Sequence, residues 1–434
     1  MTVDPSTDDN GSELPADLEE QLYAVWLDRP DEQRLPALGE LCSQHPDHSQ
    51  AFHDLVAQLE RSDSVLAGIR THAPTSEHPE RIGPYVIQEV VGRGGFGVVY
   101  RAEQTEPVQR TVAIKLLHPV RLEPIGLARF TNEQQTLAVM DHPCIARVFD
   151  AGTTEHGQPY FVMEFVEGDP ITKYCDTDRA TIEVRLQVFL QVCEAIEHAH
   201  QKGVVHRDLK PANVLVSSVG SRPLPRVIDF GIAKILSEHP GHCVDSTVAG
   251  GLLGTPEYMS PEQARGEPIG VRTDIYALGL LLFELMVGDL PFERSRLRGA
   301  GLVKIARIIS EEDPRRLSTV LEAAPTANAE AIAAQRQIGI SQLQHELRSD
   351  IEWILSKCLE KDPGQRYGSV SALIADITRF LNHQAVEARQ PALSYLARRF
   401  VRRHRVGVGV AAFVTLACLV GVIGLVWALS LIHI

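Results

Sequence analysis

The sequence predicts an α+β fold with two lobes, preceded by a helical segment and followed by a C-terminal transmembrane helix. Short β-like runs occupy residues 85–163, and helical spacing of apolar side chains dominates 168–383. Strands that precede helices along a chain are typical of α+β domains. A long apolar run at 406–432 adds the membrane helix, because it exceeds the length needed to cross a bilayer.

The N-terminal 70 residues are expected to form an acidic helical segment. Residues 1–80 carry 17 acidic and four basic side chains. The spacing of one helical face is shown by Leu18, Leu22, Val25 and Trp26. Residues 71–84 contain three prolines and few apolar side chains, which predicts a linker. The acidic side chains fit a solvated helical face, and docking on the arginines before the membrane run is the alternative.

The segment 85–163 has the texture of a strand-rich lobe. Its β-like runs are Tyr85–Val91, Val98–Ala102, Thr111–Leu116 and Tyr160–Phe165. A helical stretch at Leu127–Met140 interrupts them. Runs rich in β-branched and aromatic residues, separated by turn residues, are typical of strands.

The segment 168–383 is expected to be mainly helical. A helix over 182–200 is predicted by four apolar residues spaced four apart, namely Val184, Val188, Val192 and Ile196. Helical patterns with loops continue to Phe380, whereas 295–349 is polar, rich in Ala and Gln, and without a clear pattern. Strands first and helices after therefore predict two lobes of different character.

The apolar run Val406–Ile432 contains no Asp, Glu, Lys, Arg or His. As a helix, these 27 residues would reach about 40 Å, enough to span a hydrocarbon core of about 30 Å with some tilt. The preceding segment 384–405 is basic and contains Arg398, Arg399, Arg402, Arg403 and Arg405. Positive charge flanks the cytoplasmic end of membrane helices. We therefore expect a single-pass protein of the plasma membrane, with everything N-terminal to the run in the cytoplasm.

Composition excludes several classes of function. The net charge of −14 disfavours a nucleic-acid binder. The seven cysteines are scattered without a Cys-x-x-Cys pair, which argues against a zinc site or a disulfide framework and favours a reducing compartment. Four histidines lack the paired spacing of a metal site and fit core or surface positions better, namely His118, His142, His198 and His200.

A glycine-rich motif opens the segment that carries chemistry. It runs from Gly92 to Val99 and includes Gly94, Gly95 and Gly97. A dinucleotide-binding motif needs a helix directly after its glycines, but here the strand-like Val98-Val99-Tyr100 follows. The glycines therefore indicate a β-hairpin whose backbone can approach phosphate closely, with a purely structural turn as the alternative.

A lysine at the end of a β-branched run is the second feature. Lys115 closes Val112-Ala113-Ile114-Lys115, which would place an ammonium at the edge of a core. That position is unfavourable unless anions meet the charge, and phosphate or a carboxylate would serve. Glu133 in the predicted helix 127–140 is such a carboxylate, although a lone lysine of this kind is more often an exposed strand residue.

The segment His206-Arg207-Asp208-Leu209-Lys210-Pro211-Ala212-Asn213 is the most specific motif. An Asp and an Asn five residues apart on one loop can do different work. The carboxylate can accept a hydroxyl proton, and the amide oxygen can ligate a hard cation. Asp229-Phe230-Gly231 follows a strand-like run and supplies a second, anionic cation ligand.

Together these motifs resemble the serine/threonine protein kinase family, of the bacterial single-pass membrane type, over residues 85–383. They occur in the family's order, followed by Gly254-Thr-Pro-Glu-Tyr-Met-Ser-Pro-Glu262, Asp274-Ile-Tyr-Ala-Leu-Gly279 and Arg366. Ser-Pro-Glu stands where the family usually has Ala-Pro-Glu. The resemblance implies the two-lobed protein kinase fold, with an N-lobe at 85–163 and a C-lobe at 168–383.

The resemblance also implies roles for individual residues, with ATP and Mg²⁺ as cofactors. Lys115 would hold the α- and β-phosphates and pair with Glu133, while Asp208 would orient the substrate hydroxyl and accept its proton. Lys210 would steady the γ-phosphate, and Asn213 and Asp229 would bind Mg²⁺. The glycine loop would cover the phosphates through Gly92, Gly94 and Gly97. Contacts to adenine would come from Val99, Ala113, Leu215, the backbone of Glu164 and Val166, and Met163 at the back of the pocket.

The implied reaction is transfer of the γ-phosphoryl of ATP to Ser or Thr hydroxyls of proteins. A pseudokinase scaffold would lack Lys115, Asp208 or Asn213, and all three are present. A small-molecule kinase fits less well, because 254–262 matches the segment that shapes a peptide-binding surface in the family.

Two further expectations concern regulation. Arg207 could pair with a phosphate on Ser246 or Thr247, so autophosphorylation is expected at one of them, whereas Thr255 is expected to contact substrate. Small residues line one stripe of the membrane run at Ala417, Gly421, Gly424 and Ala428, which permits a homodimer. Such residues are frequent in membrane helices, so this second expectation is the weaker one.

Overall fold

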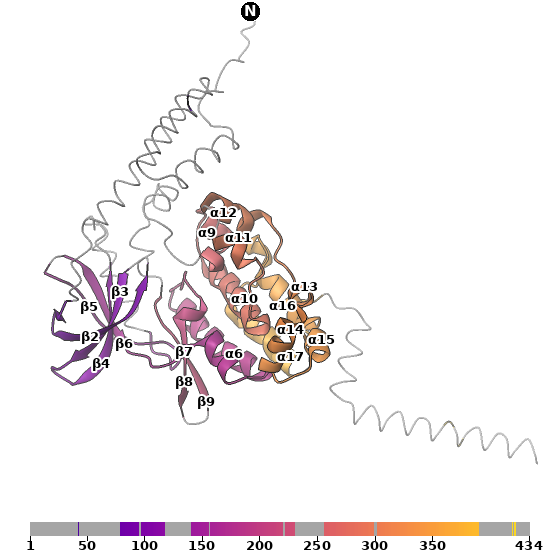
Figure 1. The fold of residues 1–434 in the computed structure, drawn as a ribbon, viewed down its shortest axis with the longest axis horizontal. Helices are drawn as coiled ribbons and strands as arrows, with labels where there is room; N and C mark the ends of the chain where they lie inside the picture. Colours follow the sequence, from indigo (N-terminus) through magenta and orange to yellow (C-terminus); the bar gives the residue numbers. More distant parts are fainter. Residues whose placement is uncertain are drawn as a thin grey trace, which may run out of the picture. The chain divides into compact units, whose positions relative to one another are not determined.

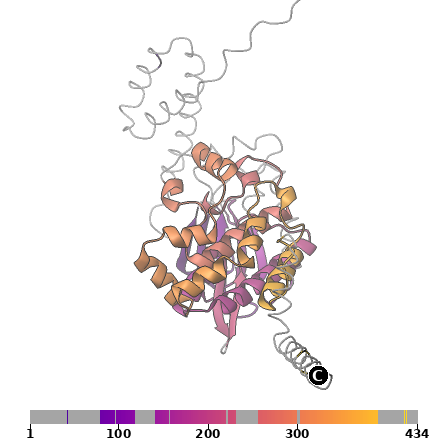
Figure 2. The same ribbon diagram turned by 90° about the vertical axis from the view of Figure 1, so that its right-hand side faces the viewer.

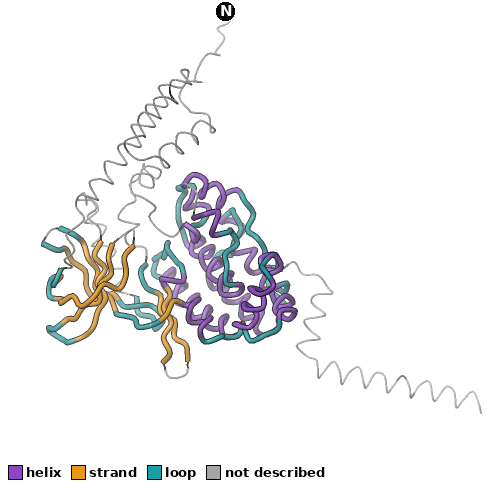
Figure 3. Tube along the Cα trace, viewed as in Figure 1, coloured by secondary structure: helices purple, strands orange, loops and turns teal. Residues whose placement is uncertain are grey.

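The computed structural model describes residues 79–94, 97–117, 140–155, 157–219, 222–230, 256–298 and 302–389, together with 42, 419 and 421. The strands and helices between 79 and 389 belong to one structural unit. They are the coloured elements of Figure 1, and Figure 3 separates them into strands and helices.

The first part of this unit is an antiparallel sheet of six strands in the order β1-β2-β3-β4-β6-β5. The strands are β1 Arg81–Ile82, β2 Tyr85–Gly94, β3 Gly97–Gln104, β4 Arg110–Leu117, β5 Val148–Thr153 and β6 Pro159–Glu164. The predicted β-like runs are confirmed as β2, β3, β4 and β6. β5 was not predicted, because Phe149-Asp-Ala-Gly carries no alternating apolar pattern.

The two faces of this sheet pack against different partners. Tyr100, Ile114 and Val162 belong to a small apolar cluster on one face. Their sequence neighbours Val99, Ala113 and Met163 contact the large core that extends into the helical part of the chain. Because successive side chains of a strand point to opposite faces, each strand contributes to both clusters. The second face is therefore the one directed toward the helices.

A second, three-stranded antiparallel sheet follows, in the order β7-β8-β9. Its strands are β7 Asp169–Pro170, β8 Val214–Val219 and β9 Arg222–Val227, and the 3-10 turn η2 at Pro211–Asn213 leads directly into β8. The pair β8–β9 connects the His206–Asn213 segment to Asp229 through a short hairpin. The hairpin thus places the His206–Asn213 segment beside Asp229.

Helices make up most of the remaining described chain. Two long helices are α6 at Ile182–Gln201, which confirms the predicted helix, and α10 at Val271–Val287. The others are α5 Ile171–Thr177, α9 Pro261–Ala264, α11 Arg294–Arg298, α12 Leu302–Glu311, α13 Leu317–Ala323, α14 Thr326–Gln335, α15 Ile340–Leu347, α16 Asp350–Cys358 and α17 Val370–Leu381, with 3-10 turns η3 Pro256–Tyr258 and η4 Pro363–Gln365. Figure 2 shows these helices gathered together, with strands of the first sheet behind them.

Helix α10 is the centre of the helical part. From Ile275 to Phe283 its sequence is apolar on every side, and Leu278, Leu281 and Leu282 are fully buried, as expected of a helix surrounded by others. It contacts α6, α16, α13 and α5. A Cβ on Gly279 would lie 2.7 Å from the Cβ of Cys358, so glycine permits α10 and α16 to approach closely at this point.

The segment 295–349, for which the sequence gave no clear pattern, is helical in its described part. Helices α12 to α15 are short, between 7 and 10 residues, and each buries only a few side chains, such as Leu343 and Leu347 of α15. In α12 the buried Ile305, Ile308 and Ile309 do follow helical spacing, whereas α14 buries only Ala329 and Ala333 and gives little apolar pattern.

The predicted membrane helix at 406–432 lies outside the described residues, apart from Leu419 and Gly421. Among the residues that the structure does describe, no helix combines the length and the apolar character needed to cross a membrane. The predicted helices of residues 1–70 and the predicted helix 127–140 also lie outside the described part, except Cys42 and Met140.

Candidate active site

The glycine motif forms the end of the β2–β3 hairpin. Gly94 pairs with Gly97, and Gly92 pairs with Val99. A Cβ added at Gly92 or Gly94 would meet no atom within 4 Å, so packing within the described chain does not require glycine there. Gly97 differs, because its φ of +156° and the backbone of Leu116 exclude a side chain. The hairpin therefore presents bare backbone with open space around it, which suits close approach of a phosphate chain.

One face of the first sheet carries four of the predicted site residues, namely Val99, Ala113, Lys115 and Met163. Val99 is opposite Lys115 in the register of β3 and β4, and Ala113 is opposite Met163 in that of β4 and β6. Ala113 and Met163 are buried, and Val99 is half-buried. The small side chain of Ala113 sits between larger ones. The face thus combines apolar side chains with two cations, Lys115 and Arg101, and Arg101 is opposite Ala113 in the register of β3 and β4.

Lys115 forms an ion pair with Asp229, which follows β9. Its side chain is 9% exposed and that of Asp229 is 24% exposed, so both charges are largely removed from water. Asp229 has a φ of +62°, a left-handed conformation that is unfavourable for residues other than glycine. Backbone strain of this kind persists where the surroundings fix it, and it directs this carboxylate toward the first sheet. Glu133, the predicted partner of Lys115, lies outside the described residues.

Asp208, Lys210 and Asn213 are brought together on one loop. Lys210 Nζ lies 2.8 Å from Asp208 Oδ2. Asn213 Nδ2 donates to the backbone oxygen of Asp208 at 2.7 Å and to Asp208 Oδ2 at 3.2 Å. Because the amide nitrogen is committed to Asp208, the amide oxygen of Asn213 is the atom that can ligate a cation. With the Asp229 carboxylate, it provides the hard oxygen ligands that Mg²⁺ prefers.

Asp274 fixes the backbone of this loop from helix α10. Its carboxylate accepts the N–H of His206 at 2.8 Å, the N–H of Arg207 at 2.9 Å and a contact from His200 Nε2 at 2.7 Å. Asp274 is fully buried. The motif from Asp274 to Gly279 did not predict this role for Asp274, and His200 was expected at an ordinary core or surface position.

His206 occupies the interior between the loop and Phe230. Its Nδ1 accepts the N–H of Asp208, and its Nε2 lies 3.2 Å from the oxygen of Ile228. The ring lies 4.6 Å from that of Phe230. Burial lowers the pKa of His206, although Asp274, Asp208 and Asp229 act in the opposite direction. A neutral imidazole with one accepting and one donating nitrogen matches both contacts.

The predicted adenine contacts lie where the first sheet meets the second. Glu164 ends β6, and its N–H donates to the oxygen of Arg147. Its carboxylate accepts from Arg226 of β9 at 2.5 Å, so a side-chain contact joins the two sheets at this point. Val166 and Leu215 are half-buried, and Leu215 packs in β8. The contacts of Glu164, Val166 and Leu215 with adenine stay a prediction.

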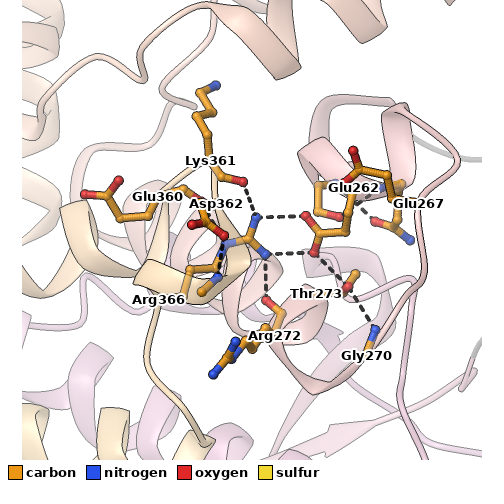
Figure 4. A network of polar contacts seen from close by, with 12 residues as sticks. Glu262, Glu267, Gly270, Arg272, Thr273, Glu360, Lys361, Asp362 and Arg366 are labelled. Atoms are coloured by element: carbon orange, nitrogen blue, oxygen red, sulfur yellow. Dashed lines mark hydrogen bonds and ion pairs between the residues drawn. The ribbon is translucent and has the colours of Figure 1, made fainter.

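Glu262 and Arg366 form a buried ion pair, shown in Figure 4. Both Nη atoms of Arg366 lie 2.8 Å from the Glu262 carboxylate, and the hydroxyl of Thr273 donates to Glu262 Oε1 at 2.8 Å. Arg366 also donates to backbone oxygens of Arg272, Glu360 and Lys361. Burial acts to raise the pKa of Glu262, but the bonds from Arg366 and Thr273 outweigh it and the pKa is lowered. The pair joins α9 to the segment before α17.

Several predicted features lie outside the described residues, namely Glu133, Gly231, Ser246, Thr247 and Thr255. Within the described ranges, no group of three or more His, Cys, Asp or Glu side chains is arranged to hold a metal ion. His142 and His198 lie with ring centroids 5.3 Å apart, and His118 lies outside the described part.

The family model for the protein kinase domain matches residues 85–384. This chain belongs to the serine/threonine protein kinase family. The serine/threonine-protein kinase PknB of Mycobacterium tuberculosis is 33% identical to it over 309 residues, which is 70% of this kinase and 44% of PknB. Pkn1 of Myxococcus xanthus is 34% identical over 324 residues, with 72% and 42% covered. The kinase described here therefore spans less than half the length of these curated relatives.

Among solved structures, the kinase domain of Mycobacterium tuberculosis PknI matches 69% of this kinase and 97% of its own chain. The sequence identity is 25% and the TM-score is 0.47.

Proposed function

We propose that this kinase transfers the γ-phosphoryl group of ATP to Ser or Thr hydroxyls of protein substrates, including its own chain. The observation that carries this proposal is the arrangement of Asp208, Lys210 and Asn213 within hydrogen-bonding distance on one loop, beside Asp229 and Lys115. These are the groups that phosphoryl transfer needs, since its catalysis is positioning and charge neutralisation.

When bound, Mg·ATP supplies the phosphoryl group and the divalent charge. Val99, Ala113, Met163 and Leu215 would provide apolar contacts for adenine, and the backbone of Glu164 and Val166 would bond its edge. The bare backbone of Gly92, Gly94 and Gly97 would cover the phosphates. Lys115 contributes a positive charge toward the α- and β-phosphates, together with a carboxylate from Glu133.

The remaining polar residues act at the transferred group. Asp208 accepts the proton of the substrate hydroxyl, and Lys210, which lies 2.8 Å from it, neutralises charge on the γ-phosphate. The Asn213 amide oxygen and the Asp229 carboxylate ligate Mg²⁺. Because Lys115 meets only Oδ1 of Asp229 in this structure, the other oxygen of the carboxylate can face the metal.

Asp208→Asn tests this function in the full chain. We expect phosphoryl transfer to a generic protein to fall at least about a hundredfold, because the proton acceptor is lost while ATP contacts remain. Radiolabel transfer and binding of Mg·ATP are measured together. Asp141→Asn is the matched control, since Asp141 is exposed and pairs only with Arg147. Unchanged transfer in Asp208→Asn would show that Asp208 is not the base.

We also propose that 406–432 anchors the kinase in the plasma membrane as one helix, with the kinase domain in the cytoplasm. The length of the apolar run and the arginines before it support this proposal. The test compares the full chain with a deletion of 406–432 by alkaline extraction of membranes. The full chain is expected to resist extraction and the deletion to be released, and release of both would overturn the anchor.

Two finer proposals rest on residues that lie, apart from Gly421, outside the described part. Autophosphorylation at Ser246 or Thr247 is expected to activate the enzyme, so the double substitution by Ala should lower activity, and full activity would refute a required switch. Homodimerisation through the stripe that contains Gly421 is expected to weaken in Gly421→Leu, as measured by crosslinking in membranes. Unchanged crosslinking would exclude that stripe as the contact.

A further inference from the structure

The residue before the candidate base has a strained backbone. Arg207 has a φ of +65°, and the N–H of Asp208 donates to the oxygen of His206 at 2.9 Å. A hydrogen bond between residues two apart, with a positive φ between them, is the rare and strained form of the γ-turn. Such a conformation persists only when neighbouring groups fix it. The contacts of the two peptide groups around Arg207 therefore decide where the side chain of Asp208 points.

The two peptide groups on either side of Arg207 carry four polar atoms, two N–H groups and two carbonyl oxygens. Three of these four atoms have hydrogen-bond partners that are described above. The N–H of Arg207 is bonded to Asp274, and the oxygen of His206 accepts from Asp208. The N–H of Asp208 also lies 3.3 Å from Nδ1 of His206. The fourth atom is the carbonyl oxygen of Arg207. Rotation of the peptide between Arg207 and Asp208 would relax the turn, and a donor to this oxygen would oppose that rotation.

Gln263 supplies that donor. Its Nε2 donates to the oxygen of Arg207 at 2.8 Å, across 56 residues of sequence. Its other amide atom, Oε1, accepts the N–H of Ser260, and its own N–H donates to the Ser260 hydroxyl, which forms a capping box at the start of α9. Both ends of the amide are thus engaged, which fixes its orientation.

The helix that carries Gln263 is itself held firmly. Glu262, the preceding residue, forms the buried pair with Arg366, and Ser260 is fully buried. A donor on a fixed support can oppose the peptide rotation, whereas one on a mobile loop would move with it. The hydrogen bond from Gln263 thus joins helix α9 to the loop that carries Asp208.

We propose that Gln263 is a positioning residue for catalysis, which holds the Arg207 carbonyl and thereby the direction of Asp208. This inference rests on the proposed kinase activity, because it assigns Asp208 the role of base. The side-chain hydrogen bonds of Gln263 within the described residues go to Ser260 and Arg207, and neither of these is proposed to contact ATP. Loss of Gln263 should therefore lower kcat and leave binding of Mg·ATP and its KM unchanged.

The test uses three variants of the full chain. Gln263→Glu keeps the acceptor for Ser260 and the capping box but replaces the donor to Arg207 by a second oxygen. Gln263→Met keeps the length and removes both polar atoms. Ser260→Ala removes the hydroxyl from the capping box and leaves the bond from Gln263 to Arg207. The first two variants thus share the loss of the donor, and the third is the matched control for the helix cap.

We expect kcat to fall about tenfold or more in both Gln263 variants, because small misplacements of a catalytic group are costly. The KM for ATP should stay within about twofold, and Ser260→Ala should keep kcat within about twofold. If both Gln263 variants keep kcat within about twofold, or if Ser260→Ala loses as much as they do, the positioning role is refuted. Equal binding stoichiometry for Mg·ATP in all variants confirms that folded protein is compared.

Amide hydrogen exchange of the peptide that covers 206–209 tests the same link without activity. Exchange should become faster in Gln263→Glu and stay unchanged in Ser260→Ala, since only the first frees the Arg207 peptide. If the unsubstituted chain transfers no phosphoryl group, the proposed function fails, and exchange alone decides the inference. Unchanged exchange in Gln263→Glu would then overturn it.

Discussion

At the scale of single residues, the site consists of charges that are partly removed from water and compensate one another. Lys115 lies in β4 of the first sheet and Asp229 follows β9 of the second, 114 residues further along the chain, yet they form one ion pair. In such a pair, loss of one partner leaves the other charge uncompensated, whereas loss of both removes that penalty. Function and stability should therefore respond differently to single and double substitutions here.

Lys115→Met and Asp229→Asn are each expected to lower the free energy of unfolding by about 1–2 kcal/mol, discounted for partial exposure. The double variant should recover part of this loss, because no unpaired charge remains. Phosphoryl transfer should stay absent in all three, since each lacks a group that the reaction uses. Denaturant unfolding and radiolabel transfer are the measurements. A double variant as unstable as the two single losses added together would contradict the coupling.

His206 makes stability depend on pH. Burial lowers its pKa in the folded state, so below about pH 6.5 the unfolded chain binds a proton that the folded chain resists. The contribution of His206 to the free energy of unfolding is thus fully present above about pH 6.5 and is lost as the pH falls below this value. The melting temperature should drop less steeply between pH 7.5 and 5.5 in His206→Gln than in the unsubstituted chain. Parallel slopes would assign the pH dependence to other groups, such as His142, whose pKa is also lowered by burial.

At the scale of elements, the buried pair of Glu262 and Arg366 fixes α9 to the segment before α17. The structure offers a matched exposed pair, because Arg296 and Glu312 also meet through two contacts, at 2.7 and 2.9 Å. The side chains of the buried pair are at most 3% exposed, and those of the second pair are 51% and 42% exposed. The two ion pairs therefore have similar contact distances but differ in their exposure to water.

Glu262→Gln is expected to lower the free energy of unfolding by about 3–5 kcal/mol, because the guanidinium of Arg366 stays buried without its counter-charge. Glu312→Gln should change it only marginally, since water and salt screen that pair. Both values come from urea unfolding of the full chain. Similar effects of the two substitutions would mean that burial does not set the strength of these pairs.

At the scale of the whole described unit, the chain stays packed beyond helix α17. Val386 is buried, and the buried carboxylate of Asp376 accepts the N–H groups of Glu387 and Ala388 at 2.8 and 2.9 Å. Asp376 also accepts from the hydroxyl of Tyr367 and from Arg379. Arg389 reaches Asp350 at 3.1 Å. The segment 386–389 is thus part of the folded unit and fixes where the chain leaves it toward 390–434.

Asp376→Ala is expected to lower the free energy of unfolding by about 2–4 kcal/mol, because two backbone N–H groups and the hydroxyl of Tyr367 lose their acceptor. Protease cleavage near 386–389 should also become faster. The control is Asp362→Ala, which removes an exposed carboxylate that accepts one N–H, from Gly364. Equal effects of the two variants, or unchanged cleavage, would show that Asp376 does not hold this segment.

Much of the N-lobe was predictable because its strands are short runs rich in β-branched and aromatic residues, as in Val112-Ala-Ile. β5 and the short helices α12 to α15 were not, since they bury few side chains each. For the site, the sequence placed Lys115, Asp208, Asn213 and Asp229 in their motifs. It did not reveal that Asp274 holds the Asp208 loop or that Gln263 reaches Arg207. The spacing of residues along the sequence does not show which partner a polar side chain will meet.

The sequence by itself determined the family, the order of the motifs and the residue types available for phosphoryl transfer, because these depend on local patterns and on identity at fixed spacing. Only the tertiary structure decided which side chains meet. Lys115 with Asp229, Glu262 with Arg366 and Gln263 with Arg207 join residues 56 to 114 positions apart. Such partners are set by how helices and sheets pack, and packing brings together groups that no spacing along the chain relates.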